Sequence, residues 1–190
     1  LIKTVSLADT GYLLVDYPGY GYNDGHPSQT HNIEAVKKAL ASLQTDLGYK
    51  PKLFVLGHSL GSAVALASLE FIQPCAIVLV SPFTSMYAMV QKTIGLVWAR
   101  LLKPFIWDTY NSYQYLATYH ASNPKIPITI IHGNKDLVVP VTMGRELASI
   151  SPNIHYIELP SIDHSLPYQA PDVFAKVLID SVASASSLCN

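Results

Sequence analysis

The chain has 190 residues, of which 49% are hydrophobic and 13% are charged, and its formal net charge is -1 at pH 7. This composition can fill a single packed core and predicts one folded domain. The near-neutral charge, with lysines and arginines scattered singly, argues against a nucleic-acid-binding protein. The two cysteines, Cys75 and Cys189, do not have the spacing of a metal-ligand set.

Short apolar runs alternate with longer helix-compatible segments, a pattern that predicts parallel strands joined by helices. The runs lack polar alternation, as do strands that are buried on both faces. In chain order, we expect strands at residues 11–16, 52–56, 76–80, 127–132 and 153–159. We expect helices at residues 32–46, 60–71, 139–149 and 171–183. The fold class is therefore α/β, with a mostly parallel sheet flanked by helices.

Residues 82–125 interrupt this alternation with an aromatic-rich segment that is too long for a simple crossover. We expect a single domain over residues 1–190, with residues 82–125 forming a helical excursion. The excursion is a candidate cap that lines an apolar acyl pocket. The alternative is an amphipathic helix packed on the sheet.

The most apolar stretch, residues 94–107, contains Arg100 and Lys103 and is shorter than the roughly 20 residues of a membrane-spanning helix. We expect no transmembrane helix and see no signal peptide. Trp98 and Trp107 near these cations resemble interfacial anchors, so contact with a membrane surface is an alternative. The chain begins with Leu1 rather than Met, so we expect any targeting segment to lie outside it, and localisation stays open.

The pentapeptide Gly57-His58-Ser59-Leu60-Gly61 directly follows an apolar run and precedes a good helix-forming segment. This strand-turn-helix setting is typical of a nucleophile elbow, in which a sharp turn exposes the serine oxygen. Glycines at both flanking positions are expected to let the strand and the helix approach closely. We therefore predict that Ser59 is a nucleophile. The alternative is an ordinary turn in which Ser59 caps the helix.

A nucleophilic serine needs a histidine base that is held by a carboxylate. His164 lies in the loop between the last expected strand and the last expected helix, and Asp136 follows an earlier strand. We predict that His164 is the base and Asp136 the carboxylate. Asp163 is the rival, although adjacent side chains seldom present themselves well to each other. The alternatives are a surface-loop role for His164 and helix N-terminal capping for Asp136.

Two further histidines lie close to these motifs. His58, inside the elbow, is expected to point its side chain away from the serine oxygen. His132, at a strand end, is expected to pack or to satisfy backbone groups.

With these three segments in hand, the chain resembles the α/β-hydrolase superfamily, and specifically its Bem46-like or serine-aminopeptidase-like branch. The resemblance covers nearly the whole chain. Besides the elbow, it rests on Val-Asp-Tyr-Pro-Gly-Tyr-Gly at residues 15–21 with Gly25 after it, and on residues 131–140. Pro18 stands where the family usually has Arg, and Asn23 or Asp24 where it often has Ser.

One departure from the family concerns the start of the sheet. Family members carry an earlier strand that ends in His-Gly, and the following loop donates one backbone N–H to the oxyanion hole. This chain starts too late to contain that strand, which the resemblance places between residues 11–16 and 52–56. Either these two strands close up on each other, or the strand comes from residues outside this sequence, or the chain is a fragment.

The expected activity is cleavage of an acyl ester or thioester by Ser59, His164 and Asp136 through an acyl-enzyme intermediate. The backbone N–H of Leu60 is the expected oxyanion donor. No metal and no organic cofactor is implied, and the expected partner is a small, apolar acyl substrate. The alternatives are a serine peptidase or amidase of the same fold, and a non-catalytic interaction protein or inactive fragment.

Overall fold

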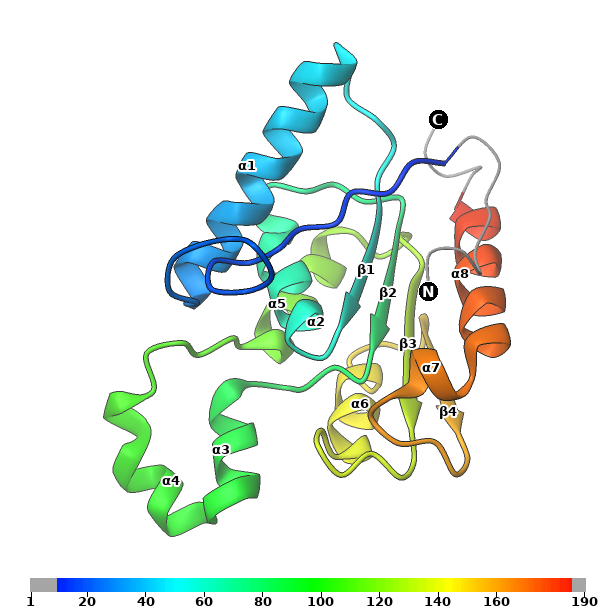
Figure 1. Ribbon diagram of the computed structural model, residues 1–190. Coiled ribbons are helices and arrows are strands. Elements are labelled where there is room, and N and C mark those ends of the chain that lie inside the picture. The colour runs from blue at the N-terminus through cyan, green and yellow to red at the C-terminus, as the bar shows by residue number, and fades with distance from the viewer. Residues whose placement is uncertain (1–9, 186–190) are drawn as a thin grey trace.

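A computed structural model of the chain describes residues 10–185. Its centre is a four-stranded sheet in the order β1-β2-β3-β4, in which every neighbouring pair is parallel (Figure 1). The strands are β1 (Phe54–His58), β2 (Ala76–Val80), β3 (Ile128–Gly133) and β4 (Ile154–Leu159). The expected α/β fold class and four of the five expected strands are therefore present.

Helices precede, connect and follow these strands. They are α1 (Gln29–Leu47), α2 (Leu60–Ala67), η2 (Ser68–Glu70), α3 (Met86–Ile94), α4 (Leu96–Leu102), η3 (Lys103–Phe105), α5 (Ser112–Ser122), α6 (Val141–Ala148), α7 (Leu166–Gln169) and α8 (Pro171–Ala185). The four expected helices correspond to α1, to α2 with η2, to α6 and to α8. None of the described helices combines the length and the apolar character that crossing a membrane requires.

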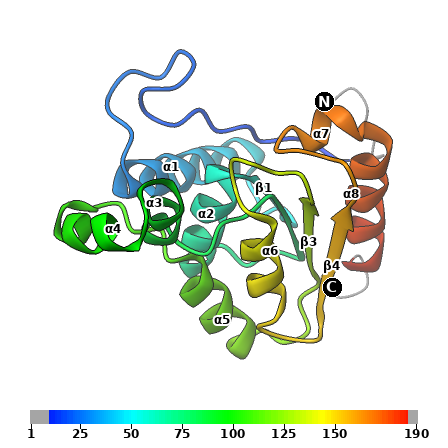
Figure 2. The same cartoon turned by 90° about the horizontal axis from the view of Figure 1, so that it is seen from below.

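The core lies on both faces of the sheet because the strands are buried on both sides. On β2, Ile77 and Leu79 pack against a cluster built from α2, α5 and α6, whereas Val78 and Val80 pack against α7 and α8. Figure 2 shows α8 on one side of the strands and α2, α5 and α6 on the other. Because all four strands are parallel, their carboxyl ends meet at one edge, where the connecting loops can carry functional side chains.

The strand expected at residues 11–16 is not formed, and this prediction was wrong. These residues have no strand conformation, and β1 pairs with β2 alone among the described residues. The two segments therefore do not close up on each other. Leu14 and Leu56 are 72% and 47% exposed, as expected for side chains with no strand beside them in the part of the chain that the structure describes.

The segment 82–125 contains α3, α4, η3 and α5. The last of these helices packs beside α2 and contributes the buried Leu116 to the core. In contrast, α3 and α4 project beyond the sheet, at the lower left of Figure 1, and Ala99 is the only buried residue of α4. The segment thus has one part in the core and one part outside it.

Candidate active site

Ser59 occupies a strained turn between β1 and α2. Its φ is 53° and its ψ is -120°, a combination that non-glycine residues rarely adopt. The Ser59 amide donates to the carbonyl of Val80 at 2.9 Å, which fixes the turn to the neighbouring strand. Ser59 makes no side-chain capping bond to α2, so the helix-capping alternative is wrong. The hydroxyl is left available for another partner.

The two glycines of the turn differ in their steric role. A Cβ on Gly57 would lie 2.5 Å from the Cα of Ser62 and 2.6 Å from the carbonyl oxygen of Gly61. A Cβ on Gly61 would meet only the Tyr17 hydroxyl, at 3.8 Å. Close approach of strand and helix therefore requires glycine at position 57, and the expectation of the same requirement at position 61 was wrong.

Three side chains from three loops form one hydrogen-bonded chain. His164 Nε2 lies 3.0 Å from Ser59 Oγ, and His164 Nδ1 lies 2.8 Å from Asp136 Oδ2. Ser59 follows β1, Asp136 follows β3 and His164 follows β4, so the parallel sheet brings together residues up to 105 positions apart. The structure thus places the three residues selected from the sequence in mutual contact.

The loops that carry Asp136 and His164 are bonded to each other. The amide of Lys135 donates to the carbonyl of Ile162 at 2.9 Å, and the amide of Ser161 donates to the side-chain oxygen of Asn134 at 2.9 Å. These bonds fix the distance between the carboxylate and the imidazole. His164 is therefore not a free surface-loop residue.

The second oxygen of the Asp136 carboxylate is held by its own loop. Asp136 Oδ1 accepts hydrogen bonds from the amides of Val138 at 2.9 Å and Val139 at 2.8 Å. Because α6 begins only at Val141, these bonds order the loop and do not cap the helix. Oδ2 remains directed at His164, as an orienting carboxylate requires.

The Asp136 side chain is fully buried. Burial alone would raise the pKa of this carboxyl, but hydrogen bonds from the rings of His132 and His164 and from the Val139 amide outweigh it and hold the pKa well below its ordinary value. Asp136 is therefore ionised at neutral pH.

His132 contacts the same carboxylate. It is fully buried, and its Nε2 lies 3.0 Å from the Val139 carbonyl and 3.4 Å from Asp136 Oδ2. Because a carbonyl oxygen only accepts, Nε2 carries the proton and donates. The expectation that His132 satisfies a backbone group is confirmed. Its approach to Asp136 was missed, although its position at the end of β3, four residues before Asp136, was a usable signal.

His58 contacts the backbone of His164. Its Nε2 donates to the His164 carbonyl at 3.1 Å, and the two ring centroids lie 5.0 Å apart. Burial lowers the pKa of His58, which keeps the ring neutral. Sequence reasoning gave His58 no partner, and no spacing signal could have found one, because the contact depends on how the His58 ring is oriented in the folded chain.

Asp163 is engaged within its own loop. Its Oδ1 accepts a hydrogen bond from the amide of Ser165 at 2.7 Å, and its Oδ2 accepts one from the side chain of Gln169 at 2.7 Å. The contact to His164 Nδ1 comes from Asp136. The structure thus favours Asp136 over Asp163 as the orienting carboxylate.

The amide of Leu60 lies at the first position of α2. The first N–H groups of a helix have no partner within the helix and lie at the positive end of its dipole, so they suit a developing negative charge. Since β1 has no strand on its other side within residues 10–185, the described chain offers no adjacent strand end for a second donor.

Apolar side chains surround the amino end of α2. A buried cluster of Ala63, Val64, Phe83, Tyr110, Val139 and Met143 is joined by the half-buried Leu60, Met86 and Met89. Leu137 and Val138, next to Asp136, are 91% and 56% exposed. Apolar side chains therefore lie on the α2 side of the site and on the loop that carries Asp136.

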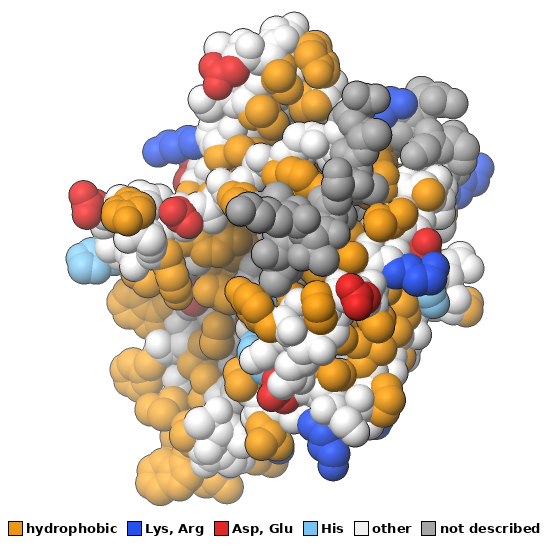
Figure 3. Space-filling view, turned by 45° about the vertical axis from the view of Figure 1, so that its right-hand side comes forward, with side chains coloured by type: hydrophobic (Ala, Val, Ile, Leu, Met, Phe, Trp, Pro, Cys, Tyr) orange, Lys and Arg blue, Asp and Glu red, His pale blue; other side chains and the backbone are white. Residues whose placement is uncertain are grey.

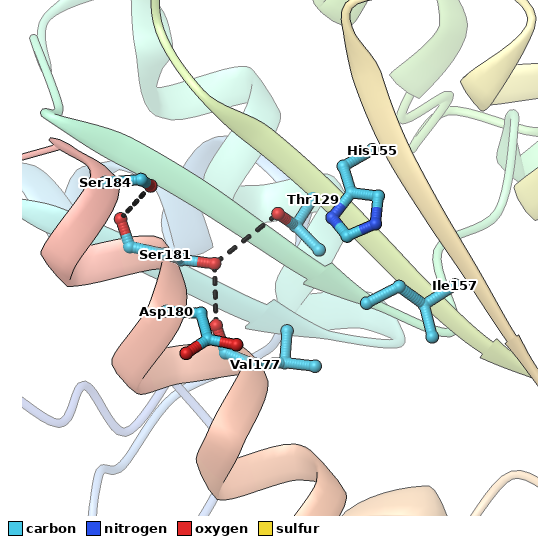
Figure 4. A pocket seen from close by; sticks show the side chains of 7 residues that line it. All are labelled: Thr129, His155, Ile157, Val177, Asp180, Ser181 and Ser184. Carbon is cyan, nitrogen blue, oxygen red and sulfur yellow. Dashed lines mark hydrogen bonds between the residues drawn. The ribbon is translucent and has the colours of Figure 1, made fainter.

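A cavity of about 210 Å³ lies elsewhere, between α8 and the strands β3 and β4 (Figure 4). Thr129, near the amino end of β3, and Ser181 of α8 face each other across it at 3.4 Å. Ser181 also donates to the Val177 carbonyl at 2.7 Å, so its hydroxyl is satisfied by its own helix. The cavity belongs to helix–sheet packing and contains none of the three residues described above.

A parallel α/β sheet with serine, aspartate and histidine on loops at the carboxyl ends of its strands is the arrangement of an α/β hydrolase. Residues 3–121 match the alpha/beta hydrolase family. The chain belongs to this family, as the resemblance implied. The more specific branch stays a prediction.

Two relatives illustrate the sequence similarity. The chain is 32% identical over 157 residues to an uncharacterized protein of Mycobacterium tuberculosis, covering 82% of this chain and 53% of that protein. It is 26% identical over 195 residues to the lysophosphatidylserine lipase ABHD12 of Danio rerio, covering 94% of this chain and 51% of the lipase. The chain thus spans about half the length of these curated relatives.

Solved structures show the same fold. The Pyrococcus furiosus esterase Pf2001 superimposes with a TM-score of 0.67 at 20% identity, covering 89% of this chain and 68% of the esterase. The meta-cleavage product hydrolase CumD of Pseudomonas fluorescens superimposes with a TM-score of 0.64 at 15% identity, covering 90% of this chain and 78% of the hydrolase. At these identities the likeness concerns the fold alone.

Proposed function

We propose that the chain is a serine hydrolase that cleaves acyl esters or thioesters, with Ser59 as nucleophile, His164 as base and Asp136 as orienting carboxylate. The observation that carries this proposal is the hydrogen-bonded chain from Ser59 Oγ through His164 to Asp136, at 3.0 and 2.8 Å. Family membership supports hydrolysis as the reaction class. The strained backbone at Ser59 supports the nucleophile role, since such strain persists where the surrounding structure enforces it.

In the proposed reaction, Ser59 Oγ attacks the substrate carbonyl carbon while its proton passes to His164 Nε2. The tetrahedral oxyanion accepts a hydrogen bond from the Leu60 amide, and the ionised Asp136 stabilises the imidazolium. Collapse of this intermediate breaks the bond to the alcohol or thiol, which leaves with the proton from His164. Water then attacks the acyl-enzyme with His164 again as base, and this step releases the acid and restores Ser59.

We infer that the substrate is a small acyl compound with an apolar chain. Apolar side chains flank Ser59 on α2, on α3 and on the loop after Asp136. Burying an acyl chain against them removes apolar surface from water, at roughly 0.8 kcal/mol per methylene group. One sequence relative, at 26% identity, is named as a lysophosphatidylserine lipase, which supports an ester substrate.

The test is hydrolysis of p-nitrophenyl esters of increasing acyl chain length by the parent chain and by the Ser59→Ala variant. We expect serine-dependent hydrolysis whose kcat/KM rises with chain length. Aminoacyl p-nitroanilides, assayed beside the esters, address the competing peptidase or amidase activity, because triad chemistry is shared and the pocket selects the acyl group. Faster cleavage of the anilides than of every ester would replace the esterase proposal with the peptidase one.

A further inference from the structure

The outer part of the excursion, residues 94–107, exposes a dense group of large hydrophobic side chains. We call these residues the excursion tip. The exposed fractions of its most prominent side chains run from 62% for Leu101 to 85% for Trp107, and this group comprises Leu96, Val97, Trp98, Leu101, Phe105 and Trp107. Figure 3 shows hydrophobic side chains gathered at the lower left, where the excursion projects. Contiguous apolar surface of this kind marks an interaction site.

Helix α4 is hydrophobic on nearly all sides, although the molecule buries little of it. Its seven residues Leu-Val-Trp-Ala-Arg-Leu-Leu contain one polar side chain, Arg100, and one buried side chain, Ala99. A helix that is hydrophobic all round is normally enclosed by other apolar material. The exposed side chains of α4 therefore fit a second, apolar surface.

The base of the excursion is firmly held, in contrast to its tip. The backbone amide of Gln29 donates a hydrogen bond to the Asp108 carboxylate at 2.7 Å. The side chain of Gln29 donates to the Tyr115 hydroxyl at 2.9 Å and accepts a hydrogen bond from the Tyr110 amide at 2.9 Å. The side chain of Asn32 donates to the Tyr110 hydroxyl at 2.9 Å. These bonds join the returning chain to the amino end of α1. The tip is thus presented on a fixed support.

The charged side chains of the segment 86–107 have one sign, and Asp108, which follows it, accepts a hydrogen bond from the Gln29 amide. Residues 86–107 contain Lys92, Arg100 and Lys103 and no aspartate or glutamate. All three cations are exposed, and the ammonium of Lys103 lies 5.3 Å from the centre of the Tyr87 ring. Cations beside exposed tryptophan and phenylalanine are the combination by which proteins bind the interface of an anionic membrane.

The tip lies on the same side of the molecule as the candidate active site. The excursion begins after the carboxyl end of β2, and the carboxyl ends of β1, β3 and β4 lead to Ser59, Asp136 and His164. Figure 1 shows α3 and α4 projecting beyond that end of the strands. A surface that receives the tip would therefore lie toward the edge of the sheet that carries these residues.

We propose that the excursion tip docks the protein on an anionic lipid surface, with its aromatic and aliphatic side chains in the interfacial layer and Lys92 and Arg100 at the headgroups. This docking does not depend on hydrolysis. The Ser59→Ala variant is therefore expected to bind the surface as the parent chain does, which separates failure of this proposal from failure of the proposed function.

Intrinsic fluorescence reports on the tip directly, because Trp98 and Trp107 are the only tryptophans of the chain. The experiment titrates the Ser59→Ala chain with phosphatidylcholine vesicles, with and without phosphatidylserine. We expect a blue shift of the emission and protection from acrylamide with the anionic vesicles, and an apparent affinity at least about tenfold weaker without phosphatidylserine. Equal binding to both vesicles, or no shift with either, would overturn the proposal.

Two sets of substitutions locate the contact, and vesicle flotation measures their binding. Lys92→Gln with Arg100→Gln keeps both tryptophans and is expected to weaken binding to anionic vesicles by about tenfold or more. Its matched control is Lys50→Gln with Lys52→Gln, at the amino end of β1. Trp98→Ser with Trp107→Ser is expected to abolish binding, whereas Tyr22→Ser with Tyr49→Ser, which changes exposed aromatics elsewhere, is expected to retain it.

Two further results count against lipid docking. The first is equal loss of binding in the tip variants and in their controls. The second is acrylamide protection of the tryptophans without vesicles together with a dimeric mass in solution, because a second copy of the chain would then cover the tip. All variants change exposed side chains, and far-ultraviolet circular dichroism establishes that each is folded before it is assayed.

Discussion

His132 Nε2 lies 3.4 Å from Asp136 Oδ2, the same oxygen that His164 Nδ1 contacts at 2.8 Å. Two imidazoles thus share one buried carboxylate oxygen. The second imidazole does not reach Ser59, so its effect on the reaction would pass through Asp136. We therefore expect His132 to act as a positioning residue for the carboxylate.

Replacing His132 with leucine is expected to lower kcat/KM by about 10- to 100-fold, because a hydrogen bond to a buried charge is lost. The effect should fall mainly on kcat, since His132 does not line the apolar surface next to Ser59. Ester hydrolysis by His132→Leu measures it, with the exposed His155→Leu as control. Unchanged kcat in a folded His132→Leu protein would contradict the positioning role.

The two glycines of the elbow are expected to respond differently to alanine. Gly57→Ala places a Cβ 2.5 Å from the Cα of Ser62, and backbone atoms cannot yield as flexible side chains do. We expect a loss of about 3 kcal/mol or more in the free energy of unfolding. Gly61→Ala meets only ordinary contacts and should change this free energy by less than about 1 kcal/mol. Urea denaturation followed by circular dichroism compares the two, and equal destabilisation would show that the turn is described wrongly.

His58 is expected to position the backbone of His164. His58→Ala removes the donor to the His164 carbonyl and should lower kcat about tenfold. His58→Gln keeps a side-chain N–H of similar reach and should restore part of the activity. Steady-state ester kinetics of both variants provide the check. If alanine and glutamine behave alike, the hydrogen bond does not matter and only ring packing does.

Asp136 gives the stability of the protein a defined acid dependence. Its pKa is held below the unfolded value of about 4, so the ionised carboxylate stabilises the fold above that pH and this contribution is lost as the pH falls toward the folded pKa. The free energy of unfolding of the parent chain is expected to exceed that of Asp136→Asn by about 2 kcal/mol at pH 5. This difference is expected to be smaller below pH 4. Urea denaturation over this pH range measures the difference. A difference that widens on acidification below pH 4 would contradict the depressed pKa.

The sequence could predict the sheet where its strands have neighbours. Continuous apolar runs predicted β1 to β4. These strands form because each pairs with at least one other described strand. Residues 11–16 have a similar composition but pair with no strand of the described sheet, and a strand is stable only with its neighbour. Composition alone therefore could not show that this segment stays outside the sheet.

The candidate site was predictable in part for a related physical reason. Ser59, Asp136 and His164 each follow an expected strand, and parallel strands end at one edge, so their meeting follows from topology. The contacts of His58 and His132 depend on ring orientations within the assembled loops. Those orientations are set by packing and have no counterpart in residue spacing.

The most direct test of the central claim is covalent labelling of Ser59 by a fluorophosphonate probe, followed by mass spectrometry of the intact chain and of its peptides. The account predicts one adduct per chain, located on the peptide that contains Ser59, and no adduct on Ser59→Ala. His132→Leu should label more slowly than the parent chain. A folded parent chain that gains no adduct, or a Ser59→Ala chain labelled to the same extent, would contradict the assignment of Ser59 as the nucleophile.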